Sequence, residues 1–277
     1  MKVVVVNDCS HVMEDMLPFL ERNASVLFLP RSRGFFDKTF GQAYRVLRSS
    51  GDVFHVNYGL QDAWLVRKLK RLDVLWLHGS DVRVALASRK WGWMVRGNIK
   101  KAKRVFVATS DLLPLVQPLR EDVGLLPRPV RTDLFRPKCV LHSPIKAVYF
   151  PKSYDCLPDG LVGLLKSKGI SFTVVDGQMR IRYADMPSFL ASFDIFVDQT
   201  TIPELSKTCL EALSCGLASV TFQDKEHLEK RVGELADGLV LSREALRNRE
   251  FVLKYHSAEK VAQRLIRIWK DVGGNSE

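Results

Sequence analysis

The stretch LPRPVRTDLFRPK, residues 126–138, divides the chain. It holds Pro127, Pro129 and Pro137 within eleven residues, and proline interrupts helices and central strands. We therefore expect an irregular link, placed over residues 127–145. It separates a first domain, residues 1–126, from a second, residues 146–277, and a chain of 277 residues is long enough for two domains.

Apolar β-rich runs alternate with helical patterns before the link. The expected strands are 2–7, 24–29, 52–56, 73–77, 104–109 and 123–126. The expected helices between them are 11–22, 38–49, 60–70 and 91–102. Several of the runs are apolar on both faces, which is typical of buried parallel strands. The alternation predicts βαβ units around a parallel sheet.

The alternation restarts after the link. The expected strands are 145–150, 170–176, 194–198, 217–222 and 238–241, and the expected helices are 159–168, 186–193 and 206–215. The tail, 257–272, has apolar residues at helical spacing, so it forms an amphipathic helix that could pack back on the first domain. The sequence thus predicts an α/β fold of two Rossmann-like, doubly wound domains facing a central cleft. Ligands of such sheets bind beyond the carboxyl ends of the strands.

The net charge of +11 comes entirely from the first half of the chain. Residues 1–140 hold 24 Lys and Arg against 13 Asp and Glu, whereas residues 141–277 hold 18 of each. Basic residues cluster over 67–71 and 96–104. They are either solvated helix faces or a surface for an anionic partner, such as an anionic membrane. The clusters lack the interleaved aromatic residues of common nucleic-acid-binding domains, so we expect no nucleic acid partner.

Composition also bears on the location of the protein. No apolar run approaches the ~20 residues of a membrane span, and MKVVVVND, residues 1–8, does not resemble a signal peptide. Five cysteines without a C-x-x-C pair argue against a disulfide framework and against a zinc site. Cys209 and Cys215 are expected to be small buried apolar residues. We expect a cytoplasmic protein, and the basic half leaves a peripheral position at the membrane open.

The stretch PELSKTCLEALSCG, residues 203–216, indicates a ligand site. It follows the expected strand 194–198, and Ser206, Lys207 and Thr208 fall on the first turn of the next helix. Unpaired backbone N–H groups and the helix dipole favour an anion at such a turn. Lys207 adds a positive charge and Thr208 a hydroxyl donor. The favoured ligand is a phosphate.

Two carboxylates, Glu204 and Glu211, flank this turn. A carboxylate beside a phosphate is unfavourable unless it accepts hydrogen bonds, and sugar hydroxyls are suitable donors. The pattern therefore suggests a nucleoside diphosphate sugar, with its pyrophosphate at the helix start and its two sugars near the two glutamates. A capped amphipathic helix with two exposed glutamates would explain the same spacing.

The stretch PELSKTCLEALSCGLASV, residues 203–220, resembles the nucleotide-sugar signature of GT-B retaining glycosyltransferases of family 4, also called group 1. EALSCG, residues 211–216, matches the helix of that signature closely. The link also closely resembles the corresponding segment of the family. Residues 76–83, WLHGSDVR, and 100–113, KKAKRVFVATSDLL, are weaker matches. The resemblance covers about residues 52–222.

The chain departs from the family pattern in three places. Six residues separate Glu204 from Glu211, where the family usually has seven. Leu205, Ser206 and Lys207 replace the glycines that follow the first glutamate. The segment NDCSHVMED, residues 7–15, stands where the family commonly has a Gly-rich loop.

The resemblance implies roles for individual residues. Glu204 would contact the donor hexose, Glu211 the ribose, and His78 the transferred sugar. Lys152 and Lys207 would stabilise the leaving diphosphate. Gly177 allows close backbone approach, and Tyr183 lies where the base pocket begins. The expected catalytic residues are His78, Lys152, Lys207 and Glu204, and the expected donor-binding residues are Glu211, Ser206, Thr208, Gly177 and Tyr183.

The activity that the resemblance implies is transfer of a hexose, with retention, from a nucleoside diphosphate sugar to a glycan, a lipid-linked acceptor or another hydroxyl. The second domain would bind the donor and the first the acceptor. No D-x-D triad occurs, so neither a metal nor a further cofactor is expected. The alternatives are a GT-B-fold sugar-nucleotide-binding protein without transferase activity, a sugar-nucleotide epimerase or a phosphorylase.

Overall fold

The computed structural model describes the chain except residues 31–33, 35, 138–140, 152–156, 177–178, 180, 200 and 275–277. It forms two compact units. The first comprises Met1–Pro129 together with Ala258–Glu277, and the second comprises Val130–Ser257. The chain therefore passes into the second unit within the proline-rich stretch and returns to the first for its last helix.

The first unit is built on a six-stranded parallel sheet in the order β2-β1-β3-β4-β5-β6. Its strands are β1 (Lys2–Val6), β2 (Ser25–Leu29), β3 (Val53–Asn57), β4 (Val74–Leu77), β5 (Arg104–Val107) and β6 (Val123–Leu125). All six were expected from the apolar runs. The valines of β1 are fully buried on both faces of the sheet, which explains why this strand is a continuous apolar run.

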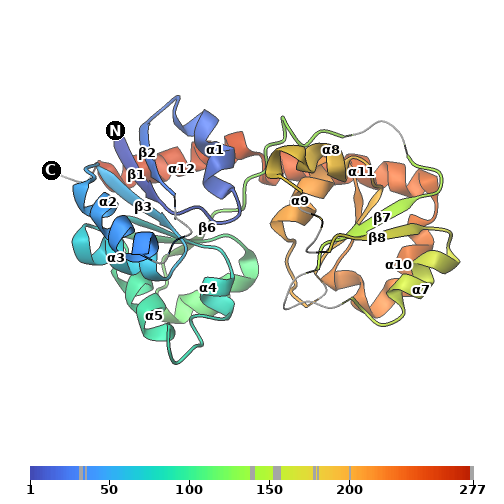
Figure 1. Ribbon diagram of the computed structural model, residues 1–277, viewed down its shortest axis with the longest axis horizontal. Helices are drawn as coiled ribbons and strands as arrows, with labels where there is room; N and C mark the ends of the chain where they lie inside the picture. The colour runs from blue at the N-terminus through green and yellow to red at the C-terminus, as the bar shows by residue number, and fades with distance from the viewer. Residues whose placement is uncertain are drawn as a thin grey trace. The chain divides into compact units, whose positions relative to one another are not determined.

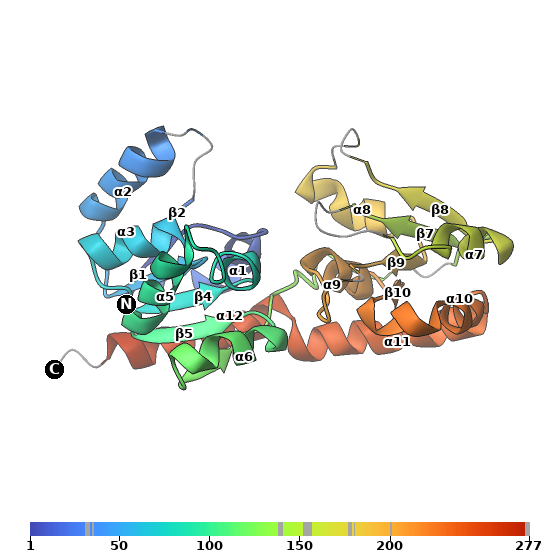
Figure 2. The same cartoon turned by 90° about the horizontal axis from the view of Figure 1, so that it is seen from below.

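Helices cover both faces of this sheet. They are α1 (Val12–Leu20), η1 (Asp37–Gly41), α2 (Gln42–Arg48), α3 (Gln61–Leu69), α4 (Ser80–Arg83), α5 (Gly92–Lys101), η2 (Ser110–Leu112), α6 (Leu113–Val116), η3 (Gln117–Leu119) and α12 (Ala258–Gly273). Val4 and Val6 of β1 face the core shared with α2, α3 and α5, whereas Val3 and Val5 face α1 and α12. Figure 2 shows α2 and α3 on the opposite side of the sheet from α12.

The last helix, α12, is part of the first core. It lies beside α1 (Figure 1), and its apolar stripe, including Val261, Leu265 and Trp269, is buried. The period of three to four residues in this stripe presents one face to the core. Trp269 is fully buried, so its truncation to alanine would cost about 3–5 kcal/mol.

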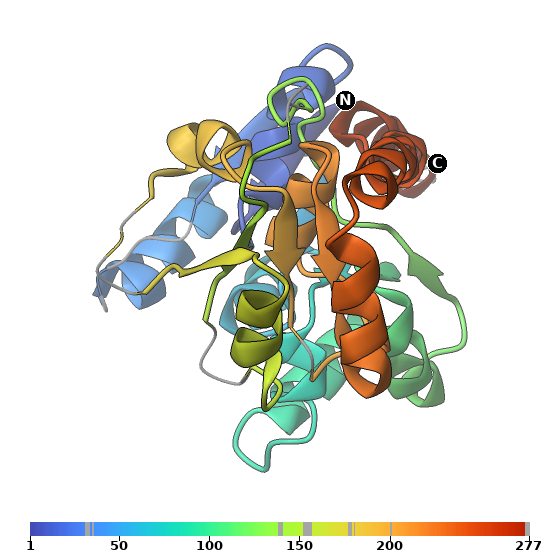
Figure 3. The ribbon, with the colours of Figure 1, turned by 90° about the vertical axis from the view of Figure 1, so that its right-hand side faces the viewer.

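The second unit has a smaller parallel sheet in the order β10-β9-β7-β8. Its strands are β7 (Lys146–Tyr149), β8 (Ser171–Val174), β9 (Ile195–Val197) and β10 (Ala218–Val220). Its helices are α7 (Leu161–Ser167), η4 (Tyr183–Asp185), α8 (Met186–Leu190), α9 (Lys207–Ser214), η5 (Phe222–His227), α10 (Leu228–Leu235) and α11 (Gly238–Tyr255). One face of the sheet packs on α8, α9 and α11, and the other packs mainly on α7 and α10 (Figures 1 and 3).

The strand expected over 238–241 is wrong, because these residues open the 18-residue helix α11. Asp237 caps the helix, and its Oδ1 accepts a hydrogen bond of 2.8 Å from the Leu239 N–H. Leu241 is buried whereas Leu239 is 70% exposed, so this short apolar run belongs to a helix with one buried face. Runs of four apolar residues do not distinguish strand from helix by themselves.

Candidate functional site

The loop between β9 and α9 positions the start of α9 at the carboxyl edge of the second sheet. The Ser206 N–H donates to Asp198 Oδ2 over 2.7 Å, and Ser206 Oγ accepts from the Cys209 N–H over 3.1 Å. Ser206 is therefore the N-cap of α9, directly before the first helical residue, Lys207. Gln199 Nε2 donates to the Glu204 carbonyl over 2.7 Å, which fixes the loop further. Thr208 follows on the first turn and is half-buried.

Three side chains meet beside this turn. Lys207 Nζ donates to Glu211 Oε1 over 2.7 Å, and the Tyr183 hydroxyl donates to the same oxygen over 2.9 Å. Lys207 Nζ also lies 3.3 Å from the Tyr183 hydroxyl. Lys207 is 8% exposed and Glu211 2% exposed, so the pair is almost wholly removed from water. The positive charge expected at the helix start is thus offset by Glu211, one helical turn further on.

Glu204 lies in a different environment. It lines a cavity of about 540 Å³ at the same edge of the sheet, together with Thr221, Asp224, Arg231 and other residues. Arg231 lies 2.5 Å from a carboxylate oxygen of Glu244, so the charges of this cavity are already paired in part. Neither Lys207 nor Glu211 is among the described residues that line it.

Two of the residues expected at the donor site, Lys152 and Gly177, lie outside the described residues. The other expected members of this site, Tyr183, Ser206, Lys207, Thr208 and Glu211, occupy one short region of the second unit. Glu204 lines the cavity described above. The structure therefore brings the helix-start residues together beside Glu211, and it places Glu204 on the wall of the cavity.

His78 follows β4 at the carboxyl edge of the first sheet, and it is buried. Its backbone N–H donates to Asp81 Oδ1 over 3.1 Å, and its carbonyl accepts from Arg128 Nη2 over 2.7 Å. Asp81 is wholly buried and also accepts from the N–H groups of Gly59 and Gly79. Burial raises the pKa of the Asp81 carboxyl, and the backbone hydrogen bonds oppose that rise. Asp81 therefore holds two loops together.

A chain of buried hydrogen bonds fixes the protonation of His78. Trp269 Nε1 donates to His55 Nδ1 over 3.0 Å, so the His55 proton is on Nε2, which lies 3.2 Å from Asn57 Oδ1. The same Asn57 oxygen lies 3.4 Å from His78 Nε2. His78 Nε2 therefore carries the proton. Its Nδ1 is a buried acceptor without a hydrogen-bond partner among the described residues.

Both imidazoles are neutral at pH 7. Burial lowers the pKa of His55 to about 4, partly opposed by its hydrogen bond with Asn57. Burial, and then the charge of Arg128, hold the pKa of His78 well below its usual range. A neutral His78 can accept a hydrogen bond from a hydroxyl, but it cannot supply positive charge.

The loops after β1 and β3 carry backbone strain that was not predicted from the residues there. These strands are neighbours, and the chain leaves β1 toward β2 and leaves β3 toward β4, which makes this a switch point of the sheet. Asn7, Ser10, His11 and Tyr58 have φ of 69°, 58°, 59° and 92°, and they are the positive-φ non-glycine residues among those described. Such conformations cost about 1–3 kcal/mol each and cluster at functional sites. The segment NDCSH, residues 7–11, contains no glycine, so its positive φ angles could not be predicted from the sequence.

The described parts of the chain include no helix that combines the length and apolarity needed to cross a bilayer. They also include no group of three or more His, Cys, Asp or Glu side chains that could hold a metal ion. Cys9, Cys209 and Cys215 are free thiols. Cys209 and Cys215 are buried, as expected, and burial raises the pKa of Cys215 to about 12, so it packs as an apolar residue.

Comparisons with known proteins concern the fold. No protein-family model and no curated protein matches the chain. Sucrose-phosphate synthase from Thermosynechococcus elongatus superimposes over 100% of both chains, with a TM-score of 0.72 and 11% identity. HepE from Anabaena, solved with UDP-glucose, covers 98% of this chain and 100% of its own, with a TM-score of 0.65 and 10% identity.

A third similar structure is UDP-GlcNAc 2-epimerase from Methanocaldococcus jannaschii, which has a TM-score of 0.54 and 10% identity. The similarity covers 98% of this chain and 100% of that enzyme. At these identities the likeness establishes the fold. The α/β class with two Rossmann-like units, expected from the sequence, is confirmed, and the fold is that of GT-B glycosyltransferases.

Proposed function

We propose that this protein is a glycosyltransferase that takes a sugar from a nucleoside diphosphate sugar bound by its second unit. The single observation that carries this proposal is the place of α9. This helix starts at the carboxyl edge of a parallel sheet, and Lys207, Glu211 and Tyr183 converge beside its first turn. The carboxyl edge is where doubly wound sheets bind nucleotides. Two structures with the same fold, sucrose-phosphate synthase and HepE with UDP-glucose, support the assignment.

The donor site would use charge that is already present. A diphosphate at the start of α9 would accept hydrogen bonds from Lys207 and Thr208, so the Lys207 ammonium would share its contacts between Glu211 and the phosphate. Glu211 would then accept from a ribose hydroxyl. We assign Ser206, Gly177 and Tyr183 to the same site, Lys152 to the pyrophosphate, and Glu204 and His78 to the transferred hexose.

In the proposed reaction the bond between the anomeric carbon and the diphosphate oxygen breaks. A bond to the acceptor oxygen forms on the same face, so the configuration is retained. The acceptor proton passes to the departing phosphate, and Lys152 and Lys207 stabilise its negative charge. Neither a metal nor a further cofactor takes part in this scheme. The first unit would bind the acceptor, a glycan or a lipid-linked hydroxyl, with no nucleic acid partner, and the protein would work in the cytoplasm.

The second candidate is a sugar-nucleotide epimerase, which the likeness to UDP-GlcNAc 2-epimerase favours. A binding protein without transferase activity is a variant of the first proposal. It is favoured by the Lys207–Glu211 pair, which already satisfies both charges. All three readings share a nucleotide-sugar site at α9 and differ in the product.

A thermal-shift series with UDP, GDP, ADP and their glucose conjugates tests the donor site. A nucleotide at 100 times its dissociation constant stabilises the folded protein by about 2.7 kcal/mol. We expect one base to raise the melting temperature, and Glu211→Gln to reduce that shift. Glu229→Gln, an exposed glutamate on α10, is the matched control. No shift with any nucleotide at millimolar concentration would contradict the proposal.

Incubation of the stabilising donor then separates the candidates. Transfer gives free nucleoside diphosphate and an acceptor glycoside with the donor's anomeric configuration, read by NMR. An epimerase changes the sugar without any acceptor, and a binding protein leaves the donor intact. Epimerised donor, or inverted product, would contradict the proposed reaction.

A further inference from the structure

The helical segment at residues 36–48 carries exposed apolar side chains along one side. Phe36, Phe40, Tyr44 and Leu47 are 75%, 73%, 63% and 55% exposed. Phe36 directly precedes η1 and the other three lie in η1 and α2. The four recur at intervals of four, four and three residues, so they share one side of the segment. We call these four side chains the apolar ridge. Large exposed apolar groups that are contiguous mark an interaction site, whereas single ones are ordinary.

The opposite side of the same segment is anchored in the first unit. Val46 and Gln42 are fully buried, and Val46 belongs to the core with α3 and α5. The ridge is therefore presented outward by a helix that the fold holds in place. It does not need to turn inward to complete the core.

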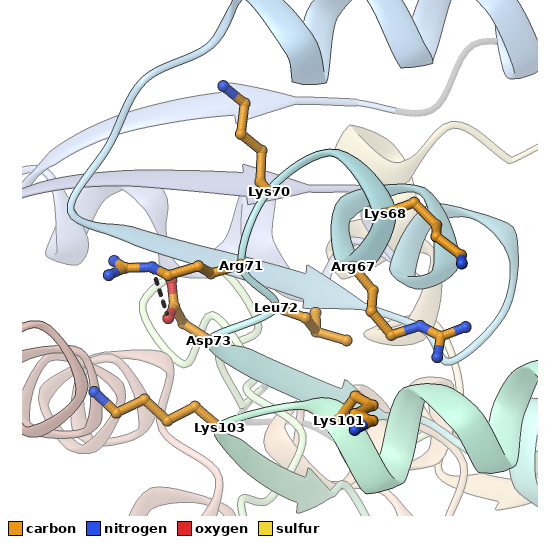
Figure 4. Close-up of a pocket in the computed structure, with 8 residues that line it drawn as sticks. All are labelled: Arg67, Lys68, Lys70, Arg71, Leu72, Asp73, Lys101 and Lys103. Carbon is orange, nitrogen blue, oxygen red and sulfur yellow. Dashed lines mark ion pairs between the residues drawn. The ribbon is translucent and has the colours of Figure 1, made fainter.

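Basic residues gather on the neighbouring helices. α2 packs on α3, and α3 packs on α5. The ends of α3 and α5 enclose a pocket of about 460 Å³, shown in Figure 4. We call it the cation pocket, and its charged lining consists of Arg67, Lys68, Lys70, Arg71, Lys101 and Lys103 with the single carboxylate of Asp73.

The one carboxylate does not neutralise this pocket. Asp73 is buried, and its Oδ2 accepts from the Phe54 N–H over 2.9 Å, while its Oδ1 lies 3.5 Å from Arg71 Nε. Lys68 and Lys101 are exposed and have no ion-pair partner among the described residues. Cations near the ends of α3 and α5 also offset the helix dipoles, but that role does not require six of them around one hollow.

We infer that the ridge and the cation pocket form a docking surface for an anionic lipid bilayer. Aromatic and leucine side chains enter the boundary between headgroups and acyl chains, while lysine and arginine side chains bind the headgroup phosphates. A nucleic acid would use the cations but leave the ridge in water. An apolar protein partner would use the ridge but leave the charge without a counterpart. An anionic membrane satisfies both features, and all of the net charge lies in the half of the chain that contains them.

Flotation of the full chain with vesicles tests this inference, and it needs no nucleotide, so its outcome is independent of the donor site. We expect the protein to float with phosphatidylcholine vesicles containing 30% phosphatidylglycerol, and much less with phosphatidylcholine alone. Added salt should weaken the binding. Lys68→Gln with Lys101→Gln should weaken it about 30-fold, since each cation near the surface contributes about 5-fold.

Phe40→Ser with Tyr44→Ser should abolish flotation without lowering the melting temperature, because both side chains are exposed. The matched controls lie on the second unit: Leu239→Ser with Leu246→Ser, both 70% exposed, and Lys225→Gln with Lys230→Gln. These should float as the wild type does. Failure of the wild type to float at low salt would overturn the inference. So would equal losses in ridge and control variants, or binding to short DNA that is as tight as binding to vesicles.

Discussion

The carboxyl edges of the two sheets differ in the side chains that could meet a ligand. The second sheet ends at a buried ion pair, in which Lys207 and Glu211 lie 2.7 Å apart. The first carries two neutral imidazoles, because His55 and His78 are uncharged and are linked through Asn57. Its buried carboxylate, Asp81, binds backbone N–H groups and, among the described residues, pairs with no cation in the way that Glu211 pairs with Lys207. An ammonium in an ion pair can share its contacts with a phosphate. Neutral imidazoles with fixed protons are suited to hydroxyl groups. The difference therefore fits the proposed division into a donor unit and an acceptor unit.

Removing one member of the ion pair is expected to have the largest effect. Glu211→Ala leaves the Lys207 ammonium buried without its carboxylate, which costs about 3–5 kcal/mol. Urea unfolding followed by far-UV circular dichroism measures the change. A double variant, Lys207→Met with Glu211→Leu, should recover most of the loss, because it removes both charges. If Glu211→Ala lowers the free energy of unfolding by less than about 1 kcal/mol, water reaches the pair. The second edge would then not hold a buried ion pair, which would contradict the comparison.

The neutral imidazoles of the first unit should instead make the free energy of unfolding depend on pH. The folded pKa of His55 is about 4 and the unfolded value is 6.5, so between these pH values the unfolded state binds more protons. Stability therefore rises with pH across this window, by about 3 kcal/mol for His55, and is fully present above pH 6.5. His78 acts in the same direction. Below pH 4 the contribution is lost.

Tryptophan fluorescence is a selective measure of this effect, because all five tryptophans are in the first unit. Between pH 4 and 7, the free energy of unfolding should rise more with pH for the wild type than for His55→Gln. The difference between the two proteins removes the contribution of the acidic residues. Parallel curves would show that His55 is protonated in the fold or reached by water.

Asp81 is a fully buried carboxylate of the first edge that binds backbone N–H groups, and the effect of changing it should be intermediate. Asp81→Asn replaces a carboxylate oxygen by an NH₂ group that faces the Gly59, His78 or Gly79 N–H groups. Leaving such donors unpaired costs about 2 kcal/mol. Asp122→Asn is the control, since Asp122 is exposed and pairs with Arg120 at the surface. Equal stability of the two variants would show that Asp81 is dispensable for the loops.

Local patterns in the sequence predicted much of the fold. Alternating apolar runs predicted the ten strands that the structure describes, and the helix expected over 206–215 matches α9 closely. These features depend on neighbours within a few residues. The strand expected over 238–241 failed because four apolar residues fit a strand and a buried helix turn equally well.

The parts that could not be predicted depend on residues that are distant in the sequence. Trp269 reaches His55 across 214 positions, and no periodicity connects them. Glu211 and Lys207 are one turn apart, yet their burial as a pair depends on Tyr183 and on the packing around α9. The positive φ angles of the loop after β1 could not be predicted, because asparagine, serine and histidine stand where glycine usually adopts positive φ.

That loop offers the smallest expected effect. Ser10 is exposed and has φ of 58°, a conformation that costs a non-glycine residue about 1–2 kcal/mol. Ser10→Gly removes this strain, although glycine gains freedom in the unfolded chain, so the free energy of unfolding should rise by only about 0.5–1 kcal/mol. Ser50→Gly, at an exposed position outside the positive-φ set, should instead lower it. Fluorescence-monitored urea unfolding compares the two. If both variants lose stability, the Ser10 side chain stabilises the loop by more than its backbone strain costs. The loop after β1 would then be held by side-chain contacts, as the start of α9 is at the second edge, and the two edges would be more alike than we infer.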